Sequence, residues 1–83
     1  MSARVTLIGK PGCHLCDVAR TVVDLVCAEE DVDFDEQDIT TDPFLAYEYA
    51  DAVPVVLVDG AEIGRYRVSP DAIRAALRSG SPR

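Results

Sequence analysis

The sequence is poor in cysteine and contains no long apolar run. Three cysteines in 83 residues are too few for a small secreted domain held together by disulfides. The first apolar stretch covers only residues 5–8, which is too short for a signal peptide or a membrane span. We therefore expect a cytoplasmic protein without a membrane partner, in which paired cysteines are catalytic or bind a metal.

Positive charge and aromatic residues are also scarce. The formal net charge is −7, and only 6% of the residues are aromatic. Such a surface repels polyanions, so the composition argues against a nucleic-acid partner. The acidic residues are concentrated between positions 29 and 42. We interpret this run as a solvated strand edge and helix end rather than a docking patch for a basic partner.

The length is that of one domain, which we assign to residues 1–83, with a flexible tail at 79–83. Hydrophobic patterns and turn residues predict strands at 4–8, 32–37, 55–58 and 62–65, and helices at 13–30, 44–49 and 71–78. A β-α-β start requires a parallel pair, whereas the Asp59-Gly60 turn requires an antiparallel hairpin. The order β-α-β-α-β-β-α therefore predicts an α/β fold with a mixed four-stranded sheet and helices on both faces.

The long predicted helix has one apolar face. Helical spacing predicts a core-facing row formed by Leu15, Val18, Val22, Leu25 and Val26. Cys27 lies at the boundary of this face, and we interpret it as a small core residue rather than a redox group.

Cys13 and Cys16 lie where a strand and a Pro-Gly turn lead into this helix. The free N–H groups and the macrodipole of a helix start favour negative charge, so they favour the thiolate of the first cysteine. Thiolate is the species that attacks disulfides. Cys16 lies one turn further along, near enough to close a ring onto Cys13 but less exposed. The spacing therefore predicts Cys13 as the nucleophile and Cys16 as the resolving thiol.

A zinc site is the main alternative for the two cysteines, but it requires four ligands. Only His14 and Cys27 remain as candidates, and Cys27 lies roughly 16 Å along the helix from Cys16. We therefore expect no metal. His14 either tunes the redox potential as a cationic neighbour or is exposed with little effect, and the sequence leaves both open.

Pro54 directly precedes a predicted buried strand, so it belongs at the first residue of that strand or in a turn. The element order, the motif Lys10-Pro11-Gly12-Cys13-x-x-Cys16, the Val53-Pro54 pair and the Asp59-Gly60 hairpin together resemble the glutaredoxins, especially small bacterial glutaredoxin-like proteins. The resemblance implies a thioredoxin-like fold and a cis Pro54 beside the active site. It also implies that the Val53 backbone pairs with an extended substrate and that Lys10 holds a glutathione carboxylate.

The sequence departs from glutaredoxins at several positions. Ala52 stands where threonine is usual, and His14-Leu15 replaces the common Pro-Tyr pair. The Gly-Gly pair and the acidic residue that grip glutathione are missing after the last strand, where the residues are Gly64-Arg65-Tyr66-Arg67-Val68. Arg65 or Arg67 can supply charge there, but we expect weak selectivity for glutathione.

The predicted function is a thiol–disulfide oxidoreductase that reduces protein or small-molecule disulfides. We expect a monomer with no bound cofactor, reduced by an external thiol such as glutathione or by a donor of the thioredoxin-reductase type. The alternative is an iron–sulfur carrier, in which Cys13 of two chains and two external thiols hold a cluster. A brown colour in protein purified without oxygen distinguishes the alternative from the reductase.

Overall fold

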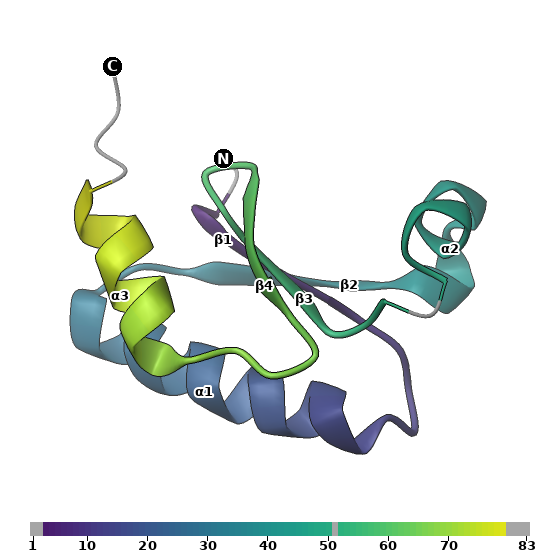
Figure 1. Ribbon diagram of the computed structural model, residues 1–83, viewed down its shortest axis with the longest axis horizontal. Helices are drawn as coiled ribbons and strands as arrows, with labels where there is room; N and C mark the ends of the chain where they lie inside the picture. Colours follow the sequence, from purple (N-terminus) through teal and green to yellow (C-terminus); the bar gives the residue numbers. More distant parts are fainter. Residues whose placement is uncertain (1–2, 51, 80–83) are drawn as a thin grey trace.

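A mixed four-stranded sheet forms the centre of the computed structural model, which describes residues 3–50 and 52–79 (Figure 1). The strands β1 (Val5–Gly9), β2 (Phe34–Asp38), β3 (Val55–Val58) and β4 (Ala61–Arg65) lie in the order β2-β1-β3-β4. β1 is parallel to β2 and antiparallel to β3, and β3 and β4 form an antiparallel hairpin. This arrangement confirms the predicted α/β fold with a mixed sheet.

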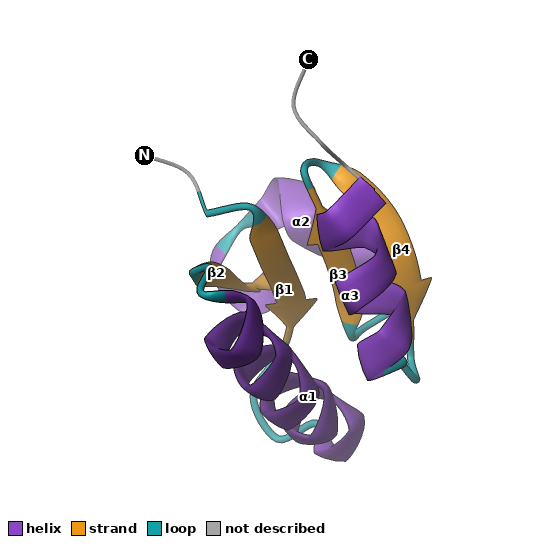
Figure 2. Ribbon diagram, turned by 90° about the vertical axis from the view of Figure 1, so that its left-hand side faces the viewer, coloured by secondary structure: helices purple, strands orange, loops and turns teal. Residues whose placement is uncertain are grey.

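The helices are α1 (His14–Glu30), α2 (Pro43–Tyr49) and α3 (Pro70–Ser79). α1 and α3 pack on the face of the sheet that includes Leu7 and Val56, whereas α2 packs beside Ile8 and Val55. Neighbouring residues of a strand point to opposite faces, so α2 lies on the other side of the sheet from α1 and α3. Figure 1 shows α2 and α3 at opposite ends of the molecule, and in Figure 2 α2 lies behind α3, farther from the viewer. None of the described helices has the length and apolar character needed to cross a membrane.

The predicted core-facing row of α1 is confirmed at Val26 and wrong at Val18 and Leu25, which are 47% and 54% exposed. Val22 is partly buried against the core, and the fully buried residues of the helix are Cys16, Ala19, Val23, Val26 and Cys27. The prediction counted only large aliphatic residues, but the row that meets the sheet begins with small side chains, which allow a helix to lie close to the strands. Cys27 is 3% exposed and belongs to the core, as predicted.

Turn and cap residues end the elements near their predicted positions. Asp59 and Gly60 both have positive φ, at 52° and 85°, which is the backbone of a tight hairpin turn. The Asp42 carboxylate accepts hydrogen bonds from the first amides of α2, as predicted for its N-cap. β2 begins two residues later than predicted, because Asp31 adopts φ 57° as the C-cap of α1 and the Val32 amide donates to Cys27 O.

A short 3₁₀ turn, η1 (Ile39–Thr41), was not predicted and joins β2 to α2. The predicted tail is partly wrong, because Ser79 is the last residue of α3. The rest of that tail, residues 80–83, lies outside the described residues.

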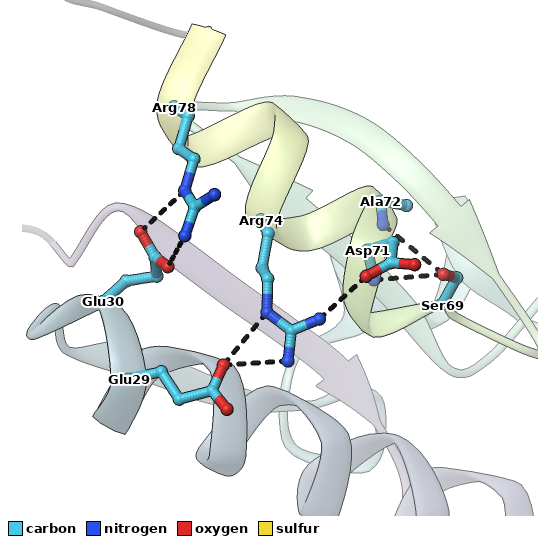
Figure 3. Close-up of polar contacts among 7 residues, drawn as sticks. All are labelled: Glu29, Glu30, Ser69, Asp71, Ala72, Arg74 and Arg78. Atoms are coloured by element: carbon cyan, nitrogen blue, oxygen red, sulfur yellow. Dashed lines mark hydrogen bonds and ion pairs between the residues drawn. The ribbon is translucent and has the colours of Figure 1, made fainter.

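Two ion pairs join the end of α1 to α3 (Figure 3). Glu29 lies 2.8 Å from the Arg74 guanidinium, and Glu30 lies 2.7 Å from that of Arg78. Arg78 also holds the pKa of Glu30 below its usual value, chiefly through their hydrogen bond. Glu29 and Glu30 belong to the acidic run, so part of this run forms ion pairs. Only a solvated surface was predicted there from the sequence.

Candidate functional site

Cys13 is the N-cap of α1, immediately after the turn that follows β1. Gly12 permits this turn, since its φ of 74° lies in the left-handed region that favours glycine. The Cys13 Sγ atom accepts a hydrogen bond from the Cys16 N–H, with an N···S distance of 3.2 Å. The sulfur therefore takes the place of the usual capping oxygen, where first-turn amides favour a negatively charged atom.

Cys16 lies one turn into α1 and is only 1% exposed, whereas Cys13 is partly exposed. Its side chain rests against Gly9, the last residue of β1. The pKa of Cys16 is raised to about 11. Burial is the largest cause, the hydrogen bond with Cys13 acts in the same direction, and a hydrogen bond with the Lys10 backbone opposes both. At neutral pH, Cys16 is therefore a protonated thiol behind the more accessible sulfur of Cys13.

The Val53–Pro54 peptide bond is cis, and both residues are buried at the start of β3. Val53 belongs to the same apolar cluster as Cys16, and Cys13 packs against that cluster. The Tyr66 amide donates to the Pro54 carbonyl at 2.7 Å, so the segment after β4 is held beside the same loop. The structure thus brings Val53, Pro54 and the two cysteines together from distant parts of the chain.

Lys10 and His14 flank Cys13 on opposite sides. Lys10 is exposed and lines a hollow with Arg20 and the end of β2, whereas His14 is exposed at the first residue of α1. Neither side chain makes a hydrogen bond or an ion pair to another described residue. A role for Lys10 in substrate binding and for His14 in tuning the thiolate therefore stays a prediction.

The last residue of β4 and the residue after it have different environments. The Arg65 guanidinium donates two hydrogen bonds of 2.7 Å to the Glu62 carboxylate, which neutralises its charge. Tyr66 has a φ of 66°, a conformation that is strained for a bulky side chain. The positive φ of Tyr66 was not predicted from the sequence. The absence of the expected glycine pair at this point of the chain was a sign that another residue adopts an unusual backbone conformation here.

Cys27 lies apart from the site, near the other end of α1. Burial raises the pKa of this thiol, and the nearby charges of Asp24 and Asp33 raise it further. Within residues 3–50 and 52–79, no group of three or more His, Cys, Asp or Glu side chains is placed to hold a metal ion. The reactive side chains that the structure brings together at the start of α1 are the thiols of Cys13 and Cys16.

The chain is similar to a known family and to solved structures. The family model described as Glutaredoxin-like domain (DUF836) matches residues 4–78. The X-ray structure of XcR50 from X. campestris is 29% identical and superposes with a TM-score of 0.74, covering 94% of this chain and 99% of that chain. The solution structure of Ne2328 from Nitrosomonas europaea is 25% identical, with a TM-score of 0.73 and coverage of 90% and 91%.

A thioredoxin from Halobacterium salinarum, at 20% identity, shares the fold with a TM-score of 0.70 over 99% of this chain and 77% of its own. Comparison with proteins of curated function gives no match.

Proposed function

The chain belongs to the glutaredoxin-like domain family, and we propose that it is a thiol–disulfide oxidoreductase that reduces protein or small-molecule disulfides through Cys13 and Cys16. The observation that carries the proposal is the asymmetry of the two thiols. Cys13 is accessible and accepts a hydrogen bond from a first-turn amide, whereas Cys16 is buried with a raised pKa. An attacking thiolate and a resolving thiol require this difference.

In the first step, the Cys13 thiolate attacks one sulfur of the substrate disulfide. A bond forms between Cys13 Sγ and that sulfur, the substrate S–S bond breaks, and the other substrate sulfur leaves as a thiolate. The amide of Cys16 stabilises the charge on Cys13 before the attack. Position 53 offers backbone groups beside the sulfur, where an extended substrate segment can pair with them.

In the second step, Cys16 loses its proton, for which the departing thiolate is one acceptor, and attacks Cys13 Sγ. The bond between Cys13 Sγ and the substrate sulfur breaks, and this sulfur leaves as a thiolate that takes a proton from water. The substrate then carries two thiols, having gained two electrons and two protons, and the protein carries a Cys13–Cys16 disulfide. An external reductant must return these electrons. We propose either two equivalents of a small thiol or a dithiol donor of the thioredoxin-reductase type.

Three single substitutions test this scheme on a peptide mixed disulfide and on a protein disulfide. Cys13→Ser should abolish both activities, because it removes the attacking thiolate. Cys16→Ser should keep part of the mixed-disulfide activity, which needs one thiol, and lose the protein-disulfide activity. Cys27→Ala is the matched control, since Cys27 lies in the core away from the site, and it should retain both activities.

Labelling experiments provide a second readout. Alkylation at neutral pH should modify Cys13 before Cys16 and Cys27, and peptide mapping of oxidised protein should find a Cys13–Cys16 disulfide with Cys27 free. Activity that survives Cys13→Ser, or faster labelling of Cys27, would overturn the assignment.

A further inference from the structure

A hollow of about 250 Å³ opens between the first turns of α1 and the segment joining β4 to α3. Figure 1 shows this segment running alongside α1. The hollow is lined mainly by His14, Leu15, Val18, Tyr66, Arg67 and Val68. Because His14 and Leu15 separate Cys13 from Cys16 in the sequence, the hollow adjoins the dithiol. It is not part of the Val53 surface, since neither Val53 nor Pro54 lines it.

The walls of the hollow include apolar side chains that remain partly exposed. Val18 is 47% exposed, Tyr66 is 46% exposed and Leu15 is half-buried, whereas Val68 is half-buried because it also packs against the core. The misplacement of Val18 in the predicted core row has its explanation here, because the residue faces this hollow rather than the sheet. Exposed apolar surface beside a reactive group favours binding of a partner's apolar side chain, because burial of both surfaces from water lowers the free energy.

Arg67 gives the hollow a positive charge with no partner in the described chain. Among residues 3–50 and 52–79, every other arginine forms a salt bridge with a carboxylate, namely Arg4, Arg20, Arg65, Arg74 and Arg78. The chain as a whole carries a formal net charge of −7. An unpaired guanidinium on an acidic protein is complementary to a carboxylate that arrives with the substrate.

We propose that this hollow selects protein substrates in which an aliphatic residue follows the reactive cysteine and an acidic residue follows that. The aliphatic side chain enters between Leu15, Val18 and Tyr66, and Arg67 pairs with the carboxylate. The volume supports a polypeptide side chain, because pockets that enclose whole small molecules are generally larger, at about 300–1,000 Å³. This inference rests on the proposed disulfide reduction and names the substrate class for the same site.

The test uses four peptides in which one cysteine, followed by Leu-Glu, Leu-Gln, Ser-Glu or Ser-Gln, carries mercaptoethanol as a mixed disulfide. The measured quantity is kcat/KM for each peptide. An exposed ion pair predicts a Glu-over-Gln preference of about two- to fivefold. Partial burial of leucine predicts a Leu-over-Ser preference of about three- to tenfold.

Two pairs of variants separate this hollow from general effects of charge and apolar surface. Arg67→Gln should bring the Glu-over-Gln ratio close to one, whereas Arg65→Gln removes the same charge from a residue that already pairs with Glu62 and should leave the ratio unchanged. Val18→Ser should reduce the Leu-over-Ser ratio. Leu25→Ser, which changes an exposed aliphatic residue of α1 that does not line the hollow, should leave it unchanged.

Equal kcat/KM for all four peptides would overturn the inference and leave the proposed function intact, whereas failure to reduce any peptide would overturn both. A Glu-over-Gln ratio that falls equally in Arg65→Gln and Arg67→Gln would show a long-range charge effect and overturn the role of Arg67. A concentration-dependent dimer that Val18→Ser dissociates would assign the hollow to a second copy of the chain and overturn the substrate assignment.

Discussion

Gly9 and Cys16 approach each other so closely that a β-carbon at position 9 would lie 3.1 Å from the Cys16 Sγ atom. Gly9 is the last residue of β1, and Cys16 is in the first turn of α1. A side chain at the strand end would therefore require the resolving thiol to move by a few tenths of an ångström.

We expect Gly9→Ala to lower the free energy of unfolding by about 1–3 kcal/mol, because an extra methyl group in a packed site forces its neighbours to move. It should also slow the attack of Cys16 on a Cys13 mixed disulfide, because the sulfur is displaced. Gly64→Ala is the control, since a β-carbon there meets Val68 at an ordinary 3.5 Å. Denaturant unfolding and the rate of leaving-thiol release measure the two effects. Equal results for the two variants would show that the Gly9 contact imposes no constraint.

The cysteine pair could be predicted from the sequence because the pattern that identifies it lies within a few neighbouring residues. A strand, a Pro-Gly turn and two cysteines three residues apart define a helix start with a thiol at each side of its first turn. The turns at Asp42 and Asp59 are local in the same sense, since each side chain or backbone conformation acts on residues next to it. The structure places these elements close to their predicted positions.

The rest depended on contacts between distant segments. Which row of α1 faces the sheet is decided by packing against β1 and β3, so Val18 and Leu25 could not be placed from periodicity alone. Tyr66 adopts positive φ although its residue type disfavours it, and its amide is held by the Pro54 carbonyl. The backbone conformation of this segment depends on a contact with a distant loop, so the sequence around Tyr66 does not predict it.

The raised pKa of Cys16 predicts a specific loss of stability at alkaline pH. The folded protein keeps the proton up to a pKa of about 11, whereas the unfolded chain releases it near the ordinary value of 9.0. The stabilisation is therefore fully present below pH 9 and is lost as the pH rises to about 11. The free energy of unfolding of the reduced protein should fall across this range by on the order of 1–3 kcal/mol more than that of Cys16→Ala.

The pKa of the Cys27 thiol is also raised by burial, but both proteins retain Cys27. The comparison therefore isolates Cys16, and urea unfolding of the two reduced proteins at several pH values measures it. Parallel curves would contradict the burial of this thiol.

The left-handed backbone at Tyr66 predicts different stabilities for two variants with small side chains. Tyr66→Gly and Tyr66→Ala both remove the ring, but only glycine adopts a φ of 66° without steric cost. Tyr66→Gly should therefore be more stable than Tyr66→Ala by about 1 kcal/mol, as thermal or denaturant unfolding would show. If the alanine variant is as stable as the glycine variant, the segment relaxes to negative φ and the Tyr66–Pro54 hydrogen bond does not hold it.

The last prediction concerns glutathione. Lys10 and the backbone at Val53 offer two of the contacts that the family resemblance implies for this tripeptide. The glycine pair that the resemblance implies for its γ-glutamyl end is missing from the segment after β4, and Arg65 of that segment is engaged by Glu62. Loss of a charged hydrogen-bonded anchor costs about 1.5–3 kcal/mol, which corresponds to roughly ten- to more than a hundredfold in affinity.

We therefore expect only a weak preference for glutathionylated over cysteinylated versions of one peptide, measured as a ratio of kcat/KM. The cysteinylated peptide is the matched control, because it presents the same reacting sulfur without the γ-glutamyl and glycine residues. Selectivity is then set by the peptide segment that Cys13 attacks rather than by the small thiol. A preference above about a hundredfold would show that an anchor for the γ-glutamyl end exists, and Arg67, which has no carboxylate partner in the described chain, would be the first residue to substitute in order to find it.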